Sequence, residues 1–323
     1  MRILVTGAGG FIGRNLTKAI ASEGHEVIAL DNNSRGKLDT LRGIKNVKTV
    51  NSDVLDAGSV EQYSEGIDAI YHLAYINGTK YFYSIPDRVL EIGIIGTHNI
   101  LKACLKQNVT RFYLASSSEV YHHADQIPTD ETVECKIPDM ENPRYSYGGG
   151  KIACELMTIN YLRNSNTQYV IFRPHNVYGP EMGFEHVLPD LIKKIYHQCK
   201  LKNTNKLEIK IQGDGSDTRA FIYIDDAIHA MKVCTLDNSE SGIYHIGNNH
   251  EISIKELVRT IAKVMGLNIT IINSEKPLGG TPRRCPDNNK IRALGFEQRV
   301  TLEDGLQKTI NYYWDQYKIR KDK

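Results

Sequence analysis

Residues 2–13 read RILVTGAGGFIG, and this stretch decides the fold. The short apolar run from Arg2 to Thr6 predicts a strand, and apolar residues at helical spacing follow the glycines. Gly7 and Gly10 allow backbone N–H groups to approach a pyrophosphate, and Gly13 allows the helix to pack closely on the strand. A strand, a glycine turn and a helix in this order indicate a dinucleotide site, with contacts expected from Gly7, Gly10, Phe11, Ile12 and Gly13.

A second strand supports this prediction and selects the cofactor. The run from Glu26 to Leu30 predicts a strand that ends at Asp31, 18 positions after Gly13. An acidic residue at this spacing accepts hydrogen bonds from a ribose diol and repels a 2′-phosphate, so NAD is predicted, with Asp31 and Asn32 among its contacts. Arg35 nearby leaves NADP as the alternative.

Strand and helix patterns alternate through the first half of the chain, which predicts an α/β fold with a Rossmann-type doubly wound parallel sheet. We expect an NAD-binding domain at 1–175 and a smaller C-terminal α/β substrate lobe at 176–323, from which some segments return to the first sheet. Further strands are expected at 47–51, 69–73, 112–115, 169–173, 208–212 and 220–223, and helices at 87–107, 147–163, 190–198, 225–233 and from a cap at Ser253 to about 265, with a surface loop at 200–206.

Composition excludes several classes of protein. Among 323 residues, 40 Lys and Arg face 38 Asp and Glu, a net charge of +2 without a basic block, so no nucleic-acid partner is expected. The six cysteines have no C-x-x-C spacing, so neither a metal site nor a disulfide framework is predicted. The first strand begins at residue 2 and no apolar run approaches the ~18 residues of a membrane span. We therefore expect a soluble, cytoplasmic protein without a signal peptide.

A tyrosine, a lysine and a hydroxyl cluster form a predicted proton-transfer site. Residues 147–151 read Tyr-Gly-Gly-Gly-Lys, which places Tyr147 and Lys151 on one helix face, and residues 116–119 read Ser-Ser-Ser-Glu. A phenol with a pKa near ~10 is a poor base at neutral pH, and we expect the lysine ammonium to lower it. Ser117 is expected to hydrogen-bond the same substrate oxygen. Such a site removes a proton from a hydroxyl while the carbon loses hydride, which requires the NAD acceptor nearby.

Over essentially its full length the chain resembles the extended short-chain dehydrogenases/reductases of the nucleotide-sugar epimerase and dehydratase family. The motifs that carry this resemblance, beyond the glycine turn and the Tyr–Lys pair, are Asp53-Val54, His72-Leu73-Ala74, the segments 116–121, 173–180 and 213–219, Tyr223-Ile224-Asp225-Asp226 and the segment 283–287.

The resemblance implies roles for particular residues. Cofactor contacts are implied for Asp53 and Val54 at the adenine, Leu73 and Ala74 at the nicotinamide ribose, and Pro174, Tyr147 and Lys151. Asn176, Arg219 and Arg284 are implied as ligands of the nucleotide diphosphate, for which guanidinium and amide groups are well suited, and Asn77 and Thr79 as contacts of the sugar. A homodimer formed by the helices at 87–107 and 147–163 is also expected from the family.

The resemblance leaves the reaction open after the first step, in which Tyr147 takes a proton from a sugar hydroxyl and NAD takes hydride, giving a 4-keto sugar. We favour 4-epimerisation of a nucleotide-diphosphate sugar, because Tyr147, Lys151 and Ser117 suffice for it. The alternative is a 4,6-dehydratase in which Glu119 is catalytic, although Ser118 stands where one dehydratase subgroup has aspartate. A decarboxylase, a net dehydrogenase or reductase, and a non-catalytic NAD-binding protein rank lower. Glu119 could also simply pair with a cation such as Arg111.

Three departures from the family pattern are expected close to the cofactor or the sugar. Tyr75 stands where the family usually has a small residue, Gly93 stands where a helix asparagine is common, and His122 stands where a glycine usually follows Val-Tyr.

Overall fold

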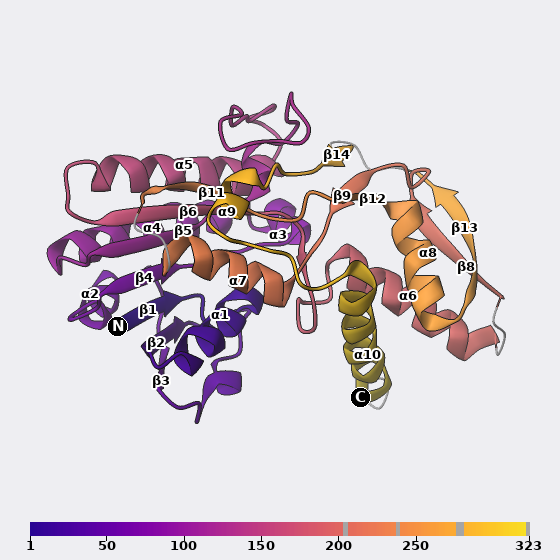
Figure 1. Ribbon diagram of the computed structural model, residues 1–323, viewed down its shortest axis with the longest axis horizontal. Helices are drawn as coiled ribbons and strands as arrows, with labels where there is room; N and C mark the ends of the chain where they lie inside the picture. Colours follow the sequence, from indigo (N-terminus) through magenta and orange to yellow (C-terminus); the bar gives the residue numbers. More distant parts are fainter. Residues whose placement is uncertain (203–205, 237–239, 276–280, 321–323) are drawn as a thin grey trace.

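The computed structural model describes residues 1–202, 206–236, 240–275 and 281–320 of the chain. Within these residues, seven strands form a parallel sheet in the order β11-β6-β5-β4-β1-β2-β3 (Figure 1). The strands are β1 (Arg2–Thr6), β2 (Glu26–Asp31), β3 (Val47–Asn51), β4 (Ala69–His72), β5 (Arg111–Ala115), β6 (Gln168–Pro174) and β11 (Gly242–Ile246). The order reverses beside β1, which confirms the predicted doubly wound Rossmann-type fold.

Helices cover both faces of this sheet, because its apolar residues alternate between two cores. Ile3 and Val5 belong to one core, whereas Leu4 between them belongs to the other. Figure 1 shows α5 above the sheet and α1 and α7 below it. The helices of this layer are α1 (Phe11–Ser22), α2 (Ala57–Tyr63), α3 (Thr79–Ser84), α4 (Pro86–Lys106), α5 (Tyr145–Leu162), α7 (Ile224–Thr235) and the 3₁₀ turns η1 (Leu38–Leu41) and η2 (Ser118–Val120).

The second lobe lies at the right of Figure 1 and is built from smaller sheets. Its elements are β7 (Val177–Tyr178), α6 (Val187–Lys202), β8 (Lys206–Gln212), β9 (Thr218–Ala220), β10 (Ile222–Tyr223), β12 (Glu251–Ser253), α8 (Ile254–Met265), β13 (Asn268–Ser274), β14 (Arg283–Arg284) and α10 (Leu302–Arg320). The short helix α9 (Asn289–Ala293) instead packs on β11 and α7 in the layer of the large sheet. Strand β8 pairs with β13, and β9 lies between β12 and β14. Although α7 and β11 follow residue 176 in the chain, both belong to the layer of the large sheet.

Local signals predicted some of these elements well and others poorly. Ser253 caps α8 through a capping box with Glu256, and Gly266 ends that helix with φ 64°, as the sequence indicated. The single strand expected at 220–223 is wrong, because β9 and β10 separate at Phe221 and pair in different sheets. The loop expected at 200–206 is shorter, since α6 continues to Lys202 and β8 begins at Lys206, while 203–205 lie outside the described residues.

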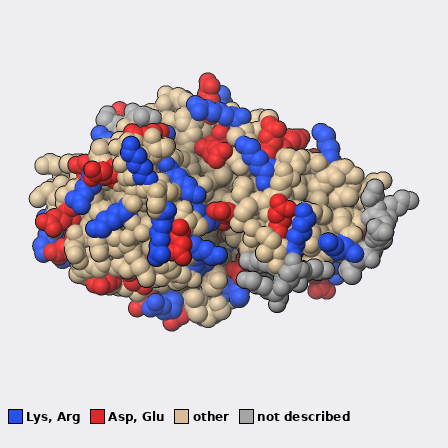
Figure 2. All heavy atoms as spheres, turned by 90° about the horizontal axis from the view of Figure 1, so that it is seen from below, with Lys and Arg blue, Asp and Glu red and all other residues tan. Residues whose placement is uncertain are grey.

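The surface carries charges of both signs. On the face shown in Figure 2, basic and acidic side chains are interspersed over the described residues. No helix in the described part of the chain combines the length and the apolar composition that crossing a bilayer requires.

Candidate active site

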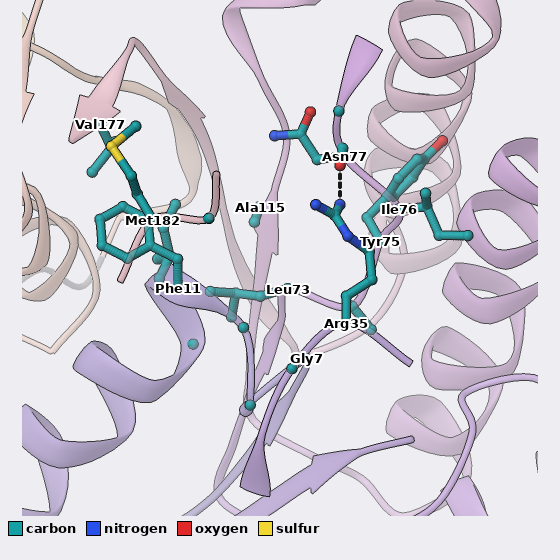
Figure 3. Close-up of a pocket in the computed structure, with 18 of the residues that line it drawn as sticks. Gly7, Phe11, Arg35, Leu73, Tyr75, Ile76, Asn77, Ala115, Val177 and Met182 are labelled. Atoms are coloured by element: carbon teal, nitrogen blue, oxygen red, sulfur yellow. Dashed lines mark hydrogen bonds between the residues drawn. The ribbon is translucent and has the colours of Figure 1, made fainter. Parts of the chain in front are cut away.

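A cavity of about 740 Å³ opens at the carboxyl ends of β1, β2, β4, β5 and β6, and the second lobe closes its other side. Carboxyl ends of parallel strands form a crevice where the strand order reverses, so the topology places the cavity here. The residues predicted from the sequence to bind the cofactor, to bind the substrate or to take part in catalysis all line this cavity, with the exception of Arg219. Figure 3 shows the central part, where Gly7, Leu73 and Ala115 lie between Phe11 on one side and Tyr75 on the other.

The glycine turn leaves no room for side chains. Gly7 has φ +69°, and a Cβ there would lie 2.7 Å from the Ala74 backbone nitrogen. A Cβ at Gly13 would overlap the Gly7 carbonyl oxygen. Gly10 precedes α1, and its N–H donates to that same oxygen at 3.1 Å. Because Phe11 and Ile12 begin α1, the first N–H groups of this helix lie at the cavity, where they can bind a diphosphate.

Asp31 ends β2 and supports the turn. Its carboxylate accepts hydrogen bonds from the backbone N–H of Gly9 at 3.0 Å and of Asn33 at 2.8 Å. Burial raises its pKa, and these two hydrogen bonds act in the opposite direction. A carboxylate offers about four lone-pair positions, so acceptor capacity remains for a ribose diol. Arg35, which would favour a 2′-phosphate, instead donates to the Asn77 carbonyl oxygen (Figure 3). Its guanidinium also covers the Tyr81 ring.

The nominated adenine and ribose contacts surround the same cavity. The Asn32 amide donates to the Asp53 carboxylate at 2.8 Å, which joins the ends of β2 and β3. The Val54 carbonyl oxygen accepts from the Asn99 amide at 3.0 Å, which fixes this loop on α4. Leu73 and Ala74 follow β4, and Pro174 ends β6; all three line the cavity.

Tyr147 and Lys151 lie on one face of α5, both buried. Helix α5 approaches the 117–119 segment closely, since a Cβ at Gly148 would lie 3.0 Å from the Glu119 carbonyl oxygen. The Lys151 ammonium donates to the Ala115 carbonyl oxygen at 2.6 Å. These contacts bring the tyrosine, the lysine and Ser117 to one corner of the cavity, as the spacing predicted.

The predicted lowering of the Tyr147 pKa is wrong for this structure. Burial raises the pKa of Tyr147, and a hydrogen bond with Ser117 opposes that rise only in part. Burial also lowers the pKa of Lys151 to about 8. The ammonium lies 5.8 Å from the centre of the Tyr147 ring, because it points toward Ala115 and the Tyr75 ring. Loss of hydration therefore outweighs the attraction between ammonium and phenolate that the sequence suggested.

Glu119 is paired with a cation, although not with Arg111. Its carboxylate accepts from the Arg284 guanidinium at 2.8 Å, and Arg284 also donates to the Thr281 hydroxyl at 3.2 Å. Burial acts to raise the pKa of Glu119, but Arg284, Arg144 and Arg219 together hold it below its usual value. Arg284, which was predicted to bind a diphosphate, thus contacts Glu119 of the 117–119 segment instead.

The other residues predicted to bind the substrate do not gather at one point of the cavity. Arg219 does not line the cavity: its guanidinium donates to the carbonyl oxygen of Thr218 at 2.7 Å. Burial and the neighbouring Arg284, its partner in the β9–β14 register, lower the pKa of Arg219 to about 10. The Asn176 amide donates to the Ala220 carbonyl oxygen at 3.1 Å, and Asn77 and Thr79 are exposed at the rim.

Two residues near the site were not assigned a role from the sequence. Tyr75 lies against both Tyr147 and Lys151, and its only signal was that it replaces a small residue. Arg144 precedes α5 and lowers the pKa of Glu119, and no local pattern distinguishes it from a surface arginine.

Known proteins resemble this chain in both sequence and structure. The family model described as the NAD dependent epimerase/dehydratase family matches residues 3–247. UDP-glucuronic acid decarboxylase 1 of Xenopus tropicalis is 31% identical, over 97% of this chain and 72% of that protein. UDP-glucose 4-epimerase of Mycolicibacterium smegmatis is 29% identical, over 97% of this chain and 98% of that protein. The crystal structure of DesIV, a dTDP-glucose 4,6-dehydratase from Streptomyces venezuelae with NAD bound, is 25% identical with a TM-score of 0.85, over 99% of this chain and 98% of that one.

Proposed function

The chain belongs to the NAD-dependent epimerase/dehydratase family, and we propose that it is a 4-epimerase of a nucleotide-diphosphate sugar that acts through a transient 4-keto sugar. The family and its neighbours are NAD-dependent enzymes that act on nucleotide sugars. The finer assignment depends on which acids, bases and cations stand beside the sugar.

The proposed first step is a coupled loss of proton and hydride at carbon 4. The Tyr147 phenolic oxygen takes the hydroxyl proton, and Ser117, which hydrogen-bonds Tyr147, orients the same substrate oxygen. The glycine turn and Lys151 line one cavity and would hold NAD, which would supply the hydride acceptor. For 4-epimerisation the ketone turns over and receives the hydride on its other face, while Tyr147 returns the proton. No further acid or base is required.

The observation that favours epimerisation over dehydration is the ion pair between Glu119 and Arg284. A 4,6-dehydratase needs a free base to remove the carbon 5 proton and an acid to expel the carbon 6 hydroxyl. A carboxylate whose pKa is lowered by a guanidinium at 2.8 Å is a weak base, and Ser118 beside it cannot act as a carboxylic acid.

Other acids along the cavity are placed elsewhere. Among the described lining residues they are Asp31 and Asp53 at the nucleotide end and two loop residues held in ion pairs, Glu181 with Arg14 at 3.0 Å and Glu185 with Lys80 at 3.7 Å. The sugar end therefore lacks the pair of carboxyl groups that elimination of water uses.

A second candidate is decarboxylation of a nucleotide-linked uronic acid. Three guanidinium groups, those of Arg284, Arg144 and Arg219, act on the single carboxylate of Glu119, and Arg284 is the one of the three that lines the cavity. The Nε atom of Arg284, which lines the cavity, is buried and has no partner among the described residues. A uronic carboxylate would match it. Once carbon 4 is a ketone, that carboxylate leaves as CO₂ and the resulting enolate takes a proton at carbon 5.

The deciding experiment incubates the protein with UDP-, dTDP- and GDP-linked hexoses and UDP-glucuronic acid in deuterated water, followed by mass spectrometry and proton NMR. Unchanged mass with inverted carbon 4 supports the epimerase. Loss of CO₂ with deuterium at carbon 5 supports the decarboxylase, and loss of water with deuterium at carbon 5 supports a dehydratase. Steady accumulation of reduced cofactor indicates a net dehydrogenase, and absence of turnover with intact NAD binding indicates a non-catalytic protein.

We also propose a homodimer through α4 and α5. These helices pack together and leave large apolar side chains in water, with Ile95 45% and Leu156 57% exposed. A second copy of the same face would bury them in a four-helix interface. Sedimentation should give the dimer mass for the wild type and the monomer mass for Leu156→Glu; a monomeric wild type contradicts the proposal.

We propose that the protein works in the cytoplasm. All six cysteines, which lie in the described residues, are free thiols, and this supports a reducing compartment.

A further inference from the structure

Tyr75 occupies a slot between two helices, directly behind the proton-transfer pair. In Figure 3 its side chain points away from Gly7 and Leu73, toward the helices beside the cavity. Gly93 of α4 and Gly150 of α5 form the walls of the slot, because a Cβ at either position would overlap the Tyr75 hydroxyl. The slot cannot widen freely, since the Cys154 thiol of α5 donates to the Gly93 carbonyl oxygen at 3.3 Å.

The ring of Tyr75 contacts both groups of the proton-transfer pair. The Lys151 ammonium lies 3.8 Å from the ring centre, within the distance of a cation–π interaction. The Tyr147 ring stands edge-on to it, with centroids 5.2 Å apart and planes at 85°. Together with the hydrogen bond from Lys151 to the Ala115 carbonyl oxygen, the ring holds the ammonium between two fixed partners.

The hydroxyl of Tyr75 is not what secures it. This oxygen is buried and has no hydrogen-bond partner among the described residues. An unpaired buried hydroxyl is unfavourable, so the ring, and not the polar tip, must account for the placement of this side chain.

Tyr75 and Gly93 are two of the departures from the family pattern noted in the sequence, and the structure makes them complementary. The three heavy atoms nearest to a Cβ at Gly93 all belong to Tyr75. A side chain at position 93 and a tyrosine at position 75 therefore exclude each other. The aromatic ring fills the space that a larger residue in α4 would take.

We propose that Tyr75 is a positioning residue for Lys151: its ring, admitted by Gly93, covers the ammonium on the side of α4 and α5 and fixes its position beside Tyr147. The inference rests on the proposed proton transfer by Tyr147 and Lys151. Without the ring, water enters behind the ammonium and the lysine side chain gains freedom to leave the Ala115 carbonyl.

A double-mutant cycle tests this arrangement with Tyr75→Ala, Gly93→Ala and the double variant. We expect each single change to lower kcat about ten- to a hundredfold, the range of a misplaced catalytic group, with KM and NAD affinity altered less than about threefold. In the double variant, Gly93→Ala should lower kcat by less than about twofold relative to Tyr75→Ala alone, because the methyl group at position 93 no longer meets a ring.

A second readout does not depend on turnover. Lys151, 3% exposed, should react slowly with an amine-acylating reagent, as followed by peptide mass spectrometry with and without NAD. Tyr75→Ala and Gly93→Ala should accelerate this labelling, and Tyr75→Phe should resemble the wild type in labelling and in kcat. If Tyr75→Ala fails to fold, Tyr75→Leu takes its place, since it preserves apolar volume without an aromatic face.

The outcomes separate the two proposals. Additive losses in the cycle, wild-type labelling in Tyr75→Ala, or a Tyr75→Phe variant as damaged as Tyr75→Ala would each overturn the positioning role. A wild type without activity on any nucleotide sugar would overturn the proposed function and leave the labelling results interpretable.

Discussion

The two ends of the cavity are built by different means. At the cofactor end, the decisive groups are backbone atoms: Gly7 lies against the Ala74 backbone, and the N–H of Gly9 is held by Asp31. At the end proposed to hold the sugar they are side chains from distant segments, such as Glu119 and Arg284, which are 165 positions apart.

This difference shows which end can change. Contacts between backbone atoms leave no room for a Cβ and depend little on residue charge. Substitutions at the glycines of the cofactor end are therefore not expected to be tolerated. Charged side chains can be exchanged without disturbing the sheet. The relatives fit this division, since their names give an epimerase, a dehydratase and a decarboxylase in one family. The following predictions test it in order of expected effect.

The largest expected effect separates chemistry from cofactor binding. Tyr147→Phe removes the phenolic oxygen and keeps the ring, which stacks on Phe82 at 4.8 Å. Turnover should fall about 10²–10⁴-fold, as for loss of a general acid–base group, while NAD affinity measured by calorimetry stays within about threefold. Turnover like that of the wild type would remove Tyr147 from the mechanism.

A single methyl group should disrupt the cofactor end. In Gly13→Ala the Cβ overlaps the Gly7 carbonyl oxygen, so α1 must shift away from β1. We expect unfolding free energy to fall by about 3 kcal/mol, the upper range for overpacking, with loss of NAD binding. Gly58→Ala in α2 is the matched control, because its Cβ would meet only the Asp56 carboxylate at 3.5 Å. Equal effects in the two variants would contradict the close-contact explanation.

Burial of the Lys151 ammonium should lower the free energy of unfolding by an amount that depends on pH. Its folded pKa of about 8 lies below the ordinary 10.5, so between these values the unfolded chain binds more protons. Wild-type stability should therefore rise with pH across that window, and the penalty is fully present below it.

Lys151→Met should therefore be more stable than the wild type by about 3 kcal/mol at pH 7, and the difference should disappear above about pH 10.5. Urea unfolding at both pH values measures this. The same variant should lose turnover and bind NAD more weakly, because the ammonium is expected to contact the nicotinamide ribose. A stability difference independent of pH would show that burial of the charge is not its cause.

The smallest effect is expected where charges are exchangeable. Glu119→Gln keeps the shape of the side chain and weakens the contact with Arg284. An epimerase should slow by less than about tenfold, whereas a dehydratase that uses Glu119 as its base would lose about 10²–10⁴-fold. Turnover of the variant on the preferred nucleotide sugar distinguishes these cases.

Local features of the sequence were read correctly where neighbours in the chain carry the information. The strand, glycine turn and helix, the acid that ends β2, and the four-residue spacing of Tyr147 and Lys151 are all short-range patterns. The sugar end was predicted less well. Arg219 does not reach the cavity, Arg284 binds Glu119, and the pairing of Tyr75 with Gly93 appeared in the sequence only as two separate departures.

The sequence by itself thus determined the parallel sheet, the cofactor class and the placement of Tyr147 and Lys151 on one helix face, because backbone geometry and helix periodicity act over a few residues. Only the tertiary structure decided which cation meets Glu119, that burial raises the Tyr147 pKa, and that an aromatic ring lies behind Lys151. The reason is physical. Charge pairing and desolvation depend on which distant segments meet and how much water they exclude, and no local pattern encodes either quantity.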